Sequence, residues 1–258
     1  MRMNAKNPSE RRANISQYIQ SKGEVTLEEL HERSPEVSSM TIRRDLEYLE
    51  RDGTIVRIRG GAKSVAQLSI LKEAAYTQRQ AANTAAKFDI AEKAARLIHS
   101  GRSIYIDSGT TCMCFAQRLP DQPLFVLTPA PNIALELAKN HGVKINLTGG
   151  QLNRDTLTLS GFNAVEYVKT LNIEIAFMAA SAFSLTSGFS CGDYYEAELK
   201  RLVIRRAQQV VVLMDSTKLK SSMPYTFARI RNVNALVTDA PLPEDYQKAL
   251  RQARVAVY

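Results

Sequence analysis

Cysteine is scarce in this chain, and the few present are poorly placed for disulfide or metal chemistry. Only three of the 258 residues are cysteine, namely Cys112, Cys114 and Cys191. Three is an odd number for a disulfide framework, and Cys112 and Cys114 have no nearby His or Cys to complete a zinc site. We therefore expect reduced thiols, no metal and no cofactor.

Long apolar runs are also missing. No stretch reaches the roughly 18 apolar residues that cross a bilayer, and the start, M-R-M-N-A-K-N-P, lacks the apolar core of a signal peptide. These absences predict a cytoplasmic protein with no membrane partner. There is no internal repeat or low-complexity tract, and the length fits two domains with ordinary cores.

The chain is basic, but its charge does not mark one segment. Lys and Arg outnumber Asp and Glu by 34 to 26, a net charge of +8. Residues 1–63 hold 12 basic and 10 acidic side chains, so only +2 of that total lies there. The position of the arginines, rather than their number, must therefore indicate any nucleic-acid surface.

Residues 38–53 have the pattern of a short amphipathic helix. Ser38 is a suitable N-cap, and Ile42, Leu46 and Leu49 share one face. The outer face of the first turns carries hydroxyl and guanidinium groups on Ser39, Thr41, Arg43 and Arg44. Such groups suit DNA phosphates and the guanine edge. The alternative is a solvated helix whose arginines are offset by neighbouring glutamates.

The elements around this helix follow the order of a winged helix-turn-helix. A T-x-x-E capping box at residues 26–29 opens a preceding helix, and Ser34-Pro35 breaks the chain after it. Residues 55–63, I-V-R-I-R-G-G-A-K, then read as a basic hairpin with a Gly-Gly turn. Residues 1–63 are therefore predicted to form a DNA-binding domain.

Residues 9–63 resemble the N-terminal domain of the DeoR family of bacterial transcriptional regulators. The resemblance is carried by V-S-S-M-T-I-R-R-D-L-E-Y-L-E-R-D-G followed by V-R-I-R-G-G-A. It implies sequence-specific binding to double-stranded operator DNA through Ser38, Ser39, Thr41, Arg43 and Arg44. It also implies backbone contacts from Arg57, Arg59 and Lys63 in the wing.

Residues 64–87 are mostly good helix formers without Pro or Gly, so we expect a helical linker. Tyr76, Arg79, Asn83 and Lys87 recur every three or four residues and would line one side of a single helix. A similar pattern leads into the effector domain of the DeoR family. The alternative is a solvated helix face.

Residues 88–258 have the pattern of an α/β domain. Helical stretches alternate with seven short apolar runs: S-I-Y-I-D, L-F-V-L-T, V-K-I-N-L-T, I-E-I-A-F-M-A-A, Q-V-V-V-L-M-D, A-L-V-T-D and V-A-V-Y. Nearly continuous hydrophobicity is typical of strands buried on both faces, which predicts a largely parallel sheet covered by helices. Ligands of such folds bind beyond the C-terminal ends of the strands.

Glycine and hydroxyl residues follow several of these runs. The first run leads into Asp107, Ser108, Gly109, Thr110 and Thr111 and then a helix, which suits a phosphate. The alternative is an ordinary Ser or Thr N-cap. Turns in T-G-G, S-G, S-G-F-S and D-S-T-K support a shared site, to which we assign Gly149, Gly150, Gly188 and Ser190. The spacing is not that of a Walker-type P-loop, so nucleotide hydrolysis is not expected.

Lys200 lies in the helical stretch Y-Y-E-A-E-L-K-R and could neutralise a phosphate, although Glu196 and Lys200 at i, i+4 also form an ordinary surface pair. Residues 103–239 resemble the DeoR sensor domain through I-D-S-G-T-T, L-T-G-G-Q-L, T-L-T-L-S-G, E-A-E-L-K-R and V-V-L-M-D-S-T-K. The resemblance implies a fold similar to ribose-phosphate isomerases and coenzyme A transferases. It also implies a phosphorylated sugar as effector, with Lys200 near its phosphate.

Two segments depart from the family pattern. Thr128-Pro129-Ala130 stands where T-N-S is common, and residues 179–182, A-A-S-A, stand where G-A-D-G is frequent. The first change removes a hydrogen-bonding amide, and the second removes an acid and glycine flexibility. We expect the sugar half of the pocket to differ from that of the relatives.

Together these features predict a homo-oligomeric repressor of a carbohydrate-utilisation operon, with operator affinity modulated by a phosphorylated sugar. The alternative is a sugar-phosphate isomerase, which needs a carboxylate base and usually a second acid or a lysine. Ser181 stands where that acid would be wanted, and a DNA-binding domain has no purpose on an isomerase. An RNA-binding or architectural protein is disfavoured, because the basic helix has no stacking aromatic beyond Tyr48.

Overall fold

The computed structural model describes residues 7–22, 24–51, 55–58, 60–64 and 74–258. The chain forms two compact units, Met1–Lys72 and Glu73–Tyr258. Each unit has hydrophobic clusters built from its own described residues. The division falls within residues 64–87, which we predicted to be a linker, and the part of that segment from residue 74 onward belongs to the larger unit.

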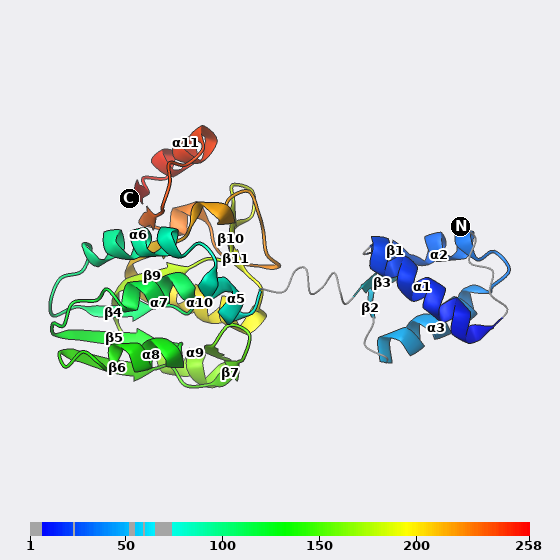
Figure 1. Ribbon diagram of the computed structural model, residues 1–258, viewed down its shortest axis with the longest axis horizontal. Helices are drawn as coiled ribbons and strands as arrows, with labels where there is room; N and C mark the ends of the chain where they lie inside the picture. Colours follow the sequence, from blue (N-terminus) through cyan, green and yellow to red (C-terminus); the bar gives the residue numbers. More distant parts are fainter. Residues whose placement is uncertain (1–6, 23, 52–54, 59, 65–73) are drawn as a thin grey trace. The chain divides into compact units, whose positions relative to one another are not determined.

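The smaller unit has the order of elements of a winged helix-turn-helix (Figure 1). Its elements are α1 (Pro8–Lys22), β1 (Glu24–Thr26), α2 (Leu27–Arg33), α3 (Ser39–Arg51), β2 (Ile55–Ile58) and β3 (Gly61–Ser64). Strands β2 and β3 form the antiparallel wing, and β1 pairs with the other side of β3. The sequence did not predict β1, because three residues carry too little alternation to identify a strand.

Helix α3 has the predicted start and the predicted buried face. The hydroxyl of Ser38 accepts a hydrogen bond from the backbone N–H of Thr41 at 3.2 Å, as an N-cap does. Ile42, Leu46 and Leu49 are buried in one cluster with residues of α1 and β2. The capping box of α2 between Thr26 and Glu29 is also present.

A buried ion pair joins α3 to α1. Asp45 is 1% exposed and lies on the inner side of α3. Its carboxylate accepts hydrogen bonds from Nε of Arg11 at 2.6 Å and from Nε of Arg12 at 2.9 Å. The neighbouring Arg43 and Arg44 are exposed. Asp45 therefore anchors the helix, while Arg43 and Arg44 remain accessible.

The larger unit is built on a parallel sheet, as predicted (Figure 1). Its strands are β4 (Ser103–Ile106), β5 (Leu124–Thr128), β6 (Val143–Leu147), β9 (Ile173–Ala179), β12 (Ala207–Leu213), β14 (Ala235–Val237) and β15 (Ala256–Val257). They lie in the order β15-β14-β12-β9-β4-β5-β6, and every neighbouring pair is parallel. Each of the seven apolar runs identified in the sequence forms one of these strands.

Helices cover both faces of this sheet. One face packs against α6 (Thr84–Ala95), α7 (Thr110–Ala116) and α8 (Pro131–Leu137), and the other against α9 (Phe162–Lys169), α10 (Tyr194–Arg206) and α11 (Glu244–Gln252). Successive strand residues alternate between the two hydrophobic clusters. In β9, for example, Phe177 packs with α7 and Met178 with the α10 side. Burial on both faces explains the continuous hydrophobicity of the strands.

Smaller antiparallel pieces complete the larger unit. They are β7 (Gln151–Asn153) with β8 (Thr158–Ser160), and β10 (Ala182–Ser184) with β11 (Gly188–Cys191) and β13 (Tyr225–Ala228). Two 3-10 turns, η1 (Ser216–Lys218) and η2 (Ile230–Asn232), lie beside them. The three cysteines are free thiols. Among the helices of the described residues, none is long and apolar enough to span a bilayer.

The predicted single helix before the sheet is wrong. The structure has α5 (Tyr76–Ala81) and then α6, separated by Ala82 in an extended conformation and by Asn83 in the left-handed region, with φ of 50°. Asn tolerates this region better than most residues. Its side-chain amide donates to Oγ1 of Thr217 at 3.1 Å and to Oδ1 of Asp215 at 3.4 Å. These tertiary contacts hold the break that helix propensity alone would not predict.

The buried ion pair of the smaller unit gives a stability prediction. Replacing Asp45 with Ala leaves the guanidinium of Arg11 buried without a counter-charge, so we expect the free energy of unfolding of this unit to fall by about 3 kcal/mol. Urea denaturation of the full chain would measure it. Glu32→Ala removes an exposed carboxylate from α2 and serves as the control. Equal stability of the two variants would contradict the proposed anchoring.

Candidate functional site

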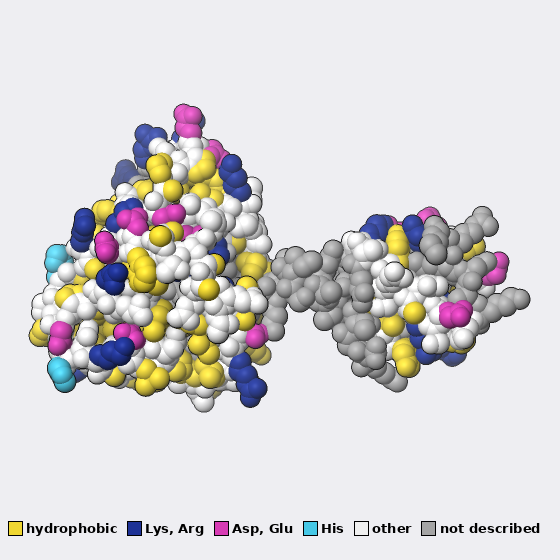
Figure 2. All heavy atoms as spheres, in the orientation of Figure 1, with side chains coloured by type: hydrophobic (Ala, Val, Ile, Leu, Met, Phe, Trp, Pro, Cys, Tyr) yellow, Lys and Arg dark blue, Asp and Glu magenta, His cyan; other side chains and the backbone are white. Residues whose placement is uncertain are grey.

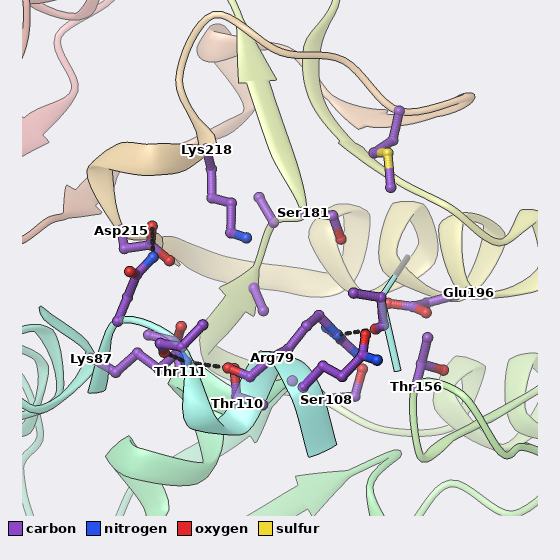
Figure 3. A pocket seen from close by; sticks show the side chains of 18 of the residues that line it. Arg79, Lys87, Ser108, Thr110, Thr111, Thr156, Ser181, Glu196, Asp215 and Lys218 are labelled. Atoms are coloured by element: carbon purple, nitrogen blue, oxygen red, sulfur yellow. Dashed lines mark hydrogen bonds between the residues drawn. The ribbon is translucent and has the colours of Figure 1, made fainter. Parts of the chain in front are cut away.

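A cavity of about 270 Å³ lies beyond the C-terminal ends of β4, β9 and β12, which are neighbours in the sheet. The strand order changes direction between β4 and β9: β5 and β6 continue to one side, and β12, β14 and β15 to the other. Such a switch point is where open α/β sheets bind ligands. Side chains from α5, α6 and the three strand ends face this space (Figure 3).

The turn after β4 brings four of the predicted residues to the cavity wall. Ser108, Gly109, Thr110 and Thr111 all line it. Gly109 is the N-cap of α7, with φ of 109°, and no side chain caps this helix. Among the described residues, the hydroxyls of Ser108, Thr110 and Thr111 have no hydrogen-bond partner. The geometry thus differs from an ordinary Ser or Thr cap and leaves three hydroxyls available to a ligand.

Lys200 lies at the cavity, but its charge is already balanced. Lys200 is 2% exposed, and its ammonium group forms ion pairs with Asp107 and with Glu196 (3.1 Å) and donates to the carbonyl oxygen of Ala179 at 3.1 Å. Burial alone lowers the pKa of this lysine, but the two carboxylates outweigh it and hold the pKa well above its usual range. The predicted i, i+4 pair exists, yet it is buried rather than on the surface.

This arrangement corrects the roles expected of Asp107 and Lys200. Asp107 is fully buried, also accepts from the backbone N–H of Ala179 at 2.9 Å, and is not part of the cavity wall. With Lys200 and Glu196 it forms a cluster of one positive and two negative charges. Lys200 is therefore a poor candidate for neutralising a ligand phosphate by itself.

Three other cations face the same space. Arg79 comes from α5, Lys87 from α6 and Lys218 from η1 (Figure 3). The side chain of Lys218 forms no hydrogen bond or ion pair with any described residue. Counting only the described residues that line the cavity, four cations stand against two carboxylates, those of Glu196 and Asp215. The wall therefore has an excess of positive charge, which favours an anionic ligand.

The sequence pattern did not single out Thr156, which lines the cavity with 4% exposure. Its hydroxyl is buried and has no hydrogen-bond partner among the described atoms. Burying an unpaired hydroxyl costs stability, so such groups often serve a ligand. The segment T-L-T-L-S-G, which carries part of the family resemblance, was the available signal for Thr156, and D-S-T-K was the signal for Lys218.

Four other predicted effector residues are not among the described residues that line this cavity: Gly149, Gly150, Gly188 and Ser190. Gly149 and Gly150 follow β6 at the edge of the sheet, and a Cβ on Gly150 would lie 2.3 Å from the carbonyl oxygen of Ser160. Gly188 meets β13 in the same way, with the oxygen of Ala228 at 2.3 Å. Ser190 accepts from the backbone N–H of Met223 at 2.8 Å and supports the wall from behind. Close backbone packing therefore accounts for Gly150 and Gly188, while Gly149, with φ of 69°, has no atom within 4 Å of a Cβ position and is set by its backbone conformation.

Of the two departures from the family pattern, only one lies at the cavity. Ala179, Ala180 and Ser181 form part of its wall. Thr128–Ala130 does not, because the hydroxyl of Thr128 is buried and accepts from the backbone N–H of Ala130 at 3.2 Å. Pro129 thus stands in a structural turn rather than at a ligand.

The candidate DNA surface is the outer face of α3. Ser39, Arg43 and Arg44 are exposed there, and Thr41 is half-buried. The hydroxyl of Ser38 lies 2.9 Å from Oγ1 of Thr41 and is occupied with capping. On the face of the larger unit that Figure 2 shows, Lys and Arg side chains lie in separate spots, so no comparable basic surface is visible there.

The wing arginine that the structure describes is tied to α3. Arg57 pairs with Glu47 at 2.9 Å and with Glu50 at 2.8 Å, and its backbone N–H donates to Glu50 at 3.0 Å. The hydrogen bonds from Arg57 lower the pKa of Glu50. Arg59 and the side chain of Lys63 lie outside the described residues. The described contacts of Arg57 link the wing to the helix.

Comparison with known families agrees with this division of the chain. Residues 11–67 match the family described as DeoR-like helix-turn-helix domain. Residues 82–240 match the family described as DeoR C terminal sensor domain. The second match alone covers more than half of the chain and includes the cavity from Ala82 onward.

Curated relatives match over nearly their whole length. The chain is 32% identical over 251 residues to the HTH-type transcriptional regulator GlpR of Haloferax volcanii, covering 97% of both chains. It is 31% identical to the HTH-type transcriptional regulator GolR of Listeria innocua, covering 97% of this chain and 98% of that protein. It is also 31% identical to a putative aga operon transcriptional repressor of Escherichia coli O157:H7, covering 96% and 93%.

Among solved structures, the chain matches ribose 5-phosphate isomerase A from Methanocaldococcus jannaschii. The match has 18% sequence identity and a TM-score of 0.41, and it covers 54% of this chain and 55% of the isomerase.

Replacing a buried threonine by valine usually lowers the free energy of unfolding, but we expect the unpaired hydroxyl of Thr156 to make the same replacement stabilising. Thr156→Val keeps the volume and removes an unsatisfied group, so the free energy of unfolding of the larger unit should rise by about 1 kcal/mol. Thr148→Val is the matched control, because that buried hydroxyl donates to the oxygen of Gly149 at 3.2 Å and its loss should destabilise. Urea denaturation would compare them. An equal loss of stability in both variants would contradict this prediction, because it would mean that the Thr156 hydroxyl has a hydrogen-bond partner.

Proposed function

Because the chain belongs to the DeoR family of HTH-type transcriptional regulators, we propose that it represses a carbohydrate-utilisation operon and responds to a phosphorylated sugar. Its curated relatives are regulators and not isomerases. One relative is named a putative aga operon transcriptional repressor and another the HTH-type transcriptional repressor GlcR. The observation that carries the proposal for this chain is the cavity at the β4/β9 switch point, with its free hydroxyls and excess of cations.

Operator recognition is assigned to the outer face of α3. Arg43 and Arg44 are exposed while Asp45 fixes the helix from the inside, so their guanidinium groups are free to reach base edges and phosphates. Ser39 and Thr41 are short enough to allow close approach to the DNA backbone. Arg57, Arg59 and Lys63 are assigned to the backbone beside the groove, with Arg57 leaving Glu47 or Glu50 for a phosphate.

Effector recognition is assigned to the cavity of the larger unit. A phosphate accepts hydrogen bonds from hydroxyls and backbone N–H groups, which Ser108, Gly109, Thr110 and Thr111 offer on one side. Lys218 supplies a positive charge that no described residue pairs. Thr156 and Glu196 stand across the cavity and suit the hydroxyl groups of a sugar (Figure 3).

The proposal includes a homo-oligomer acting in the cytoplasm. Regulators with helix-turn-helix domains usually place two recognition helices on half-sites about one turn of DNA apart, or a multiple of it. One copy of this chain has one α3. A second copy is therefore needed to read a palindromic operator. The cytoplasmic location follows from the proposed target, because the bacterial chromosome lies in the cytoplasm.

The DNA assignment predicts base-specific loss of affinity. Arg43→Ala or Arg44→Ala should weaken binding to an operator duplex, selected from a random-sequence pool, by about 1 to 3 kcal/mol if a bidentate base contact is lost. Fluorescence anisotropy titrations at several salt concentrations would measure this. Arg205→Ala removes an exposed arginine from the larger unit and should change nothing. Equal losses on operator and random DNA would show that α3 makes phosphate contacts alone.

The effector assignment predicts which lysine matters. Lys218→Met and Thr110→Val should both lower the affinity for sugar phosphates in a thermal-shift screen, because a ligand stabilises only the state that binds it. Neither should lower the melting temperature of the unliganded protein by more than about one degree, since neither side chain has a described partner. Lys248→Met, on exposed α11, is the control. Unchanged ligand-induced shifts in both variants would sink the assignment.

A further inference from the structure

Lys87 connects the cavity to the end of α5. It lies on α6, is 4% exposed and is part of the cavity wall. Its ammonium group donates to the carbonyl oxygens of Arg79 and Ala82, at the end of α5 and just beyond it. Terminal carbonyls of a helix have no partner within the helix, so a buried ammonium group is a strong substitute.

The charge of Lys87 is not balanced by any described carboxylate within ion-pair distance. Both hydrogen bonds of its ammonium group go to neutral carbonyls, which leaves one of three donors unused. Burial lowers the pKa of this lysine, as expected for a cation without a close counter-charge. An anion in the cavity would supply both the missing charge and the third acceptor.

Helix α5 depends on such contacts for its order. It has six residues, too few to be stable by itself, and Tyr76 is its one buried residue. At its start the backbone N–H of Tyr76 donates to Asp155 at 2.9 Å, and the hydroxyl of Tyr76 accepts from Asn132 at 2.8 Å. At its end the anchors are Lys87 and the amide of Asn83, which binds Asp215 and Thr217. Both end anchors stand at the cavity.

We propose that Lys87 is the positioning residue that transmits anion binding to α5. The bound anion completes the charge and hydrogen-bonding of Lys87, which strengthens its hold on the carbonyls of Arg79 and Ala82 and orders α5. This helix is the first described helix after the boundary at Lys72 and Glu73, so its order is set where the chain leaves the DNA-binding unit. The inference rests on the proposed function, because it requires an anion in the cavity.

Hydrogen exchange of the full chain, read by mass spectrometry with inorganic phosphate and with chloride at equal ionic strength, tests this. Phosphate should slow exchange in the turn from Asp107 to Thr111, which reports binding itself. In the same samples it should slow exchange in α5 by about fivefold, the lower end of ordinary coupling between sites. Lys87→Met removes a charge from the cavity wall and should bind phosphate more weakly. With the phosphate concentration raised until the turn is as protected as in the wild type, this variant should still lack the protection of α5.

The control is Gln78→Ala, which removes another cavity-lining side chain of α5 and should leave its protection intact. If Lys87→Met does not fold, Lys87→Gln keeps N–H donors for a carbonyl without the charge and should give the same result. Protection of the turn without protection of α5 in the wild type overturns the role of Lys87 and leaves the proposed effector site standing. Protection of α5 that persists in the Lys87 variants also overturns the role of Lys87 and leaves the proposed effector site standing. Protection of neither segment overturns both.

Discussion

A buried ammonium group organises the larger unit. Lys200 lies at the cavity wall with two carboxylates and one carbonyl around it, and these partners come from the residue after β4, from the end of β9 and from α10. Removing Lys200 would leave two buried carboxylates without a counter-charge, which a folded protein seldom tolerates. The cluster thus fixes the ends of two neighbouring strands against a helix, and the switch point between those strands is where the cavity opens.

The charge of that cluster shapes what the cavity can bind. Two carboxylates around one lysine leave an excess negative charge, so an anion must find its counter-charge elsewhere on the wall. Two lysines outside the strands offer this positive charge, Lys87 on α6 and Lys218 on η1. In the proposed site the ligand charge is therefore met by peripheral elements, while the strand ends offer hydroxyls and backbone groups. Under that proposal the sheet defines the position of the ligand and the outer elements respond to it.

Much of the fold was readable from the sequence, because strands buried on both faces and a capped helix with a buried stripe leave strong local patterns. The positions of Ser108, Thr110 and Thr111 followed from one rule about strand ends. Other features depend on tertiary contacts that no local pattern encodes. Asn83 breaks a good helical sequence because its side chain finds Asp215 and Thr217, over 130 positions away along the chain. Likewise, glycines at strand ends serve close backbone packing as readily as ligands, so Gly150 could not be distinguished from Gly109.

The anchoring of α3 from its inner side has a consequence for how such regulators diversify. Asp45 holds the helix to Arg11 and Arg12 from the face that never touches solvent, and the hydrophobic stripe does the same. Arg43 and Arg44, which face outward, contribute little to that scaffold. With α3 in its proposed role, Arg43 and Arg44 can change, and the target sequence with them, while the buried scaffold that holds the helix stays intact.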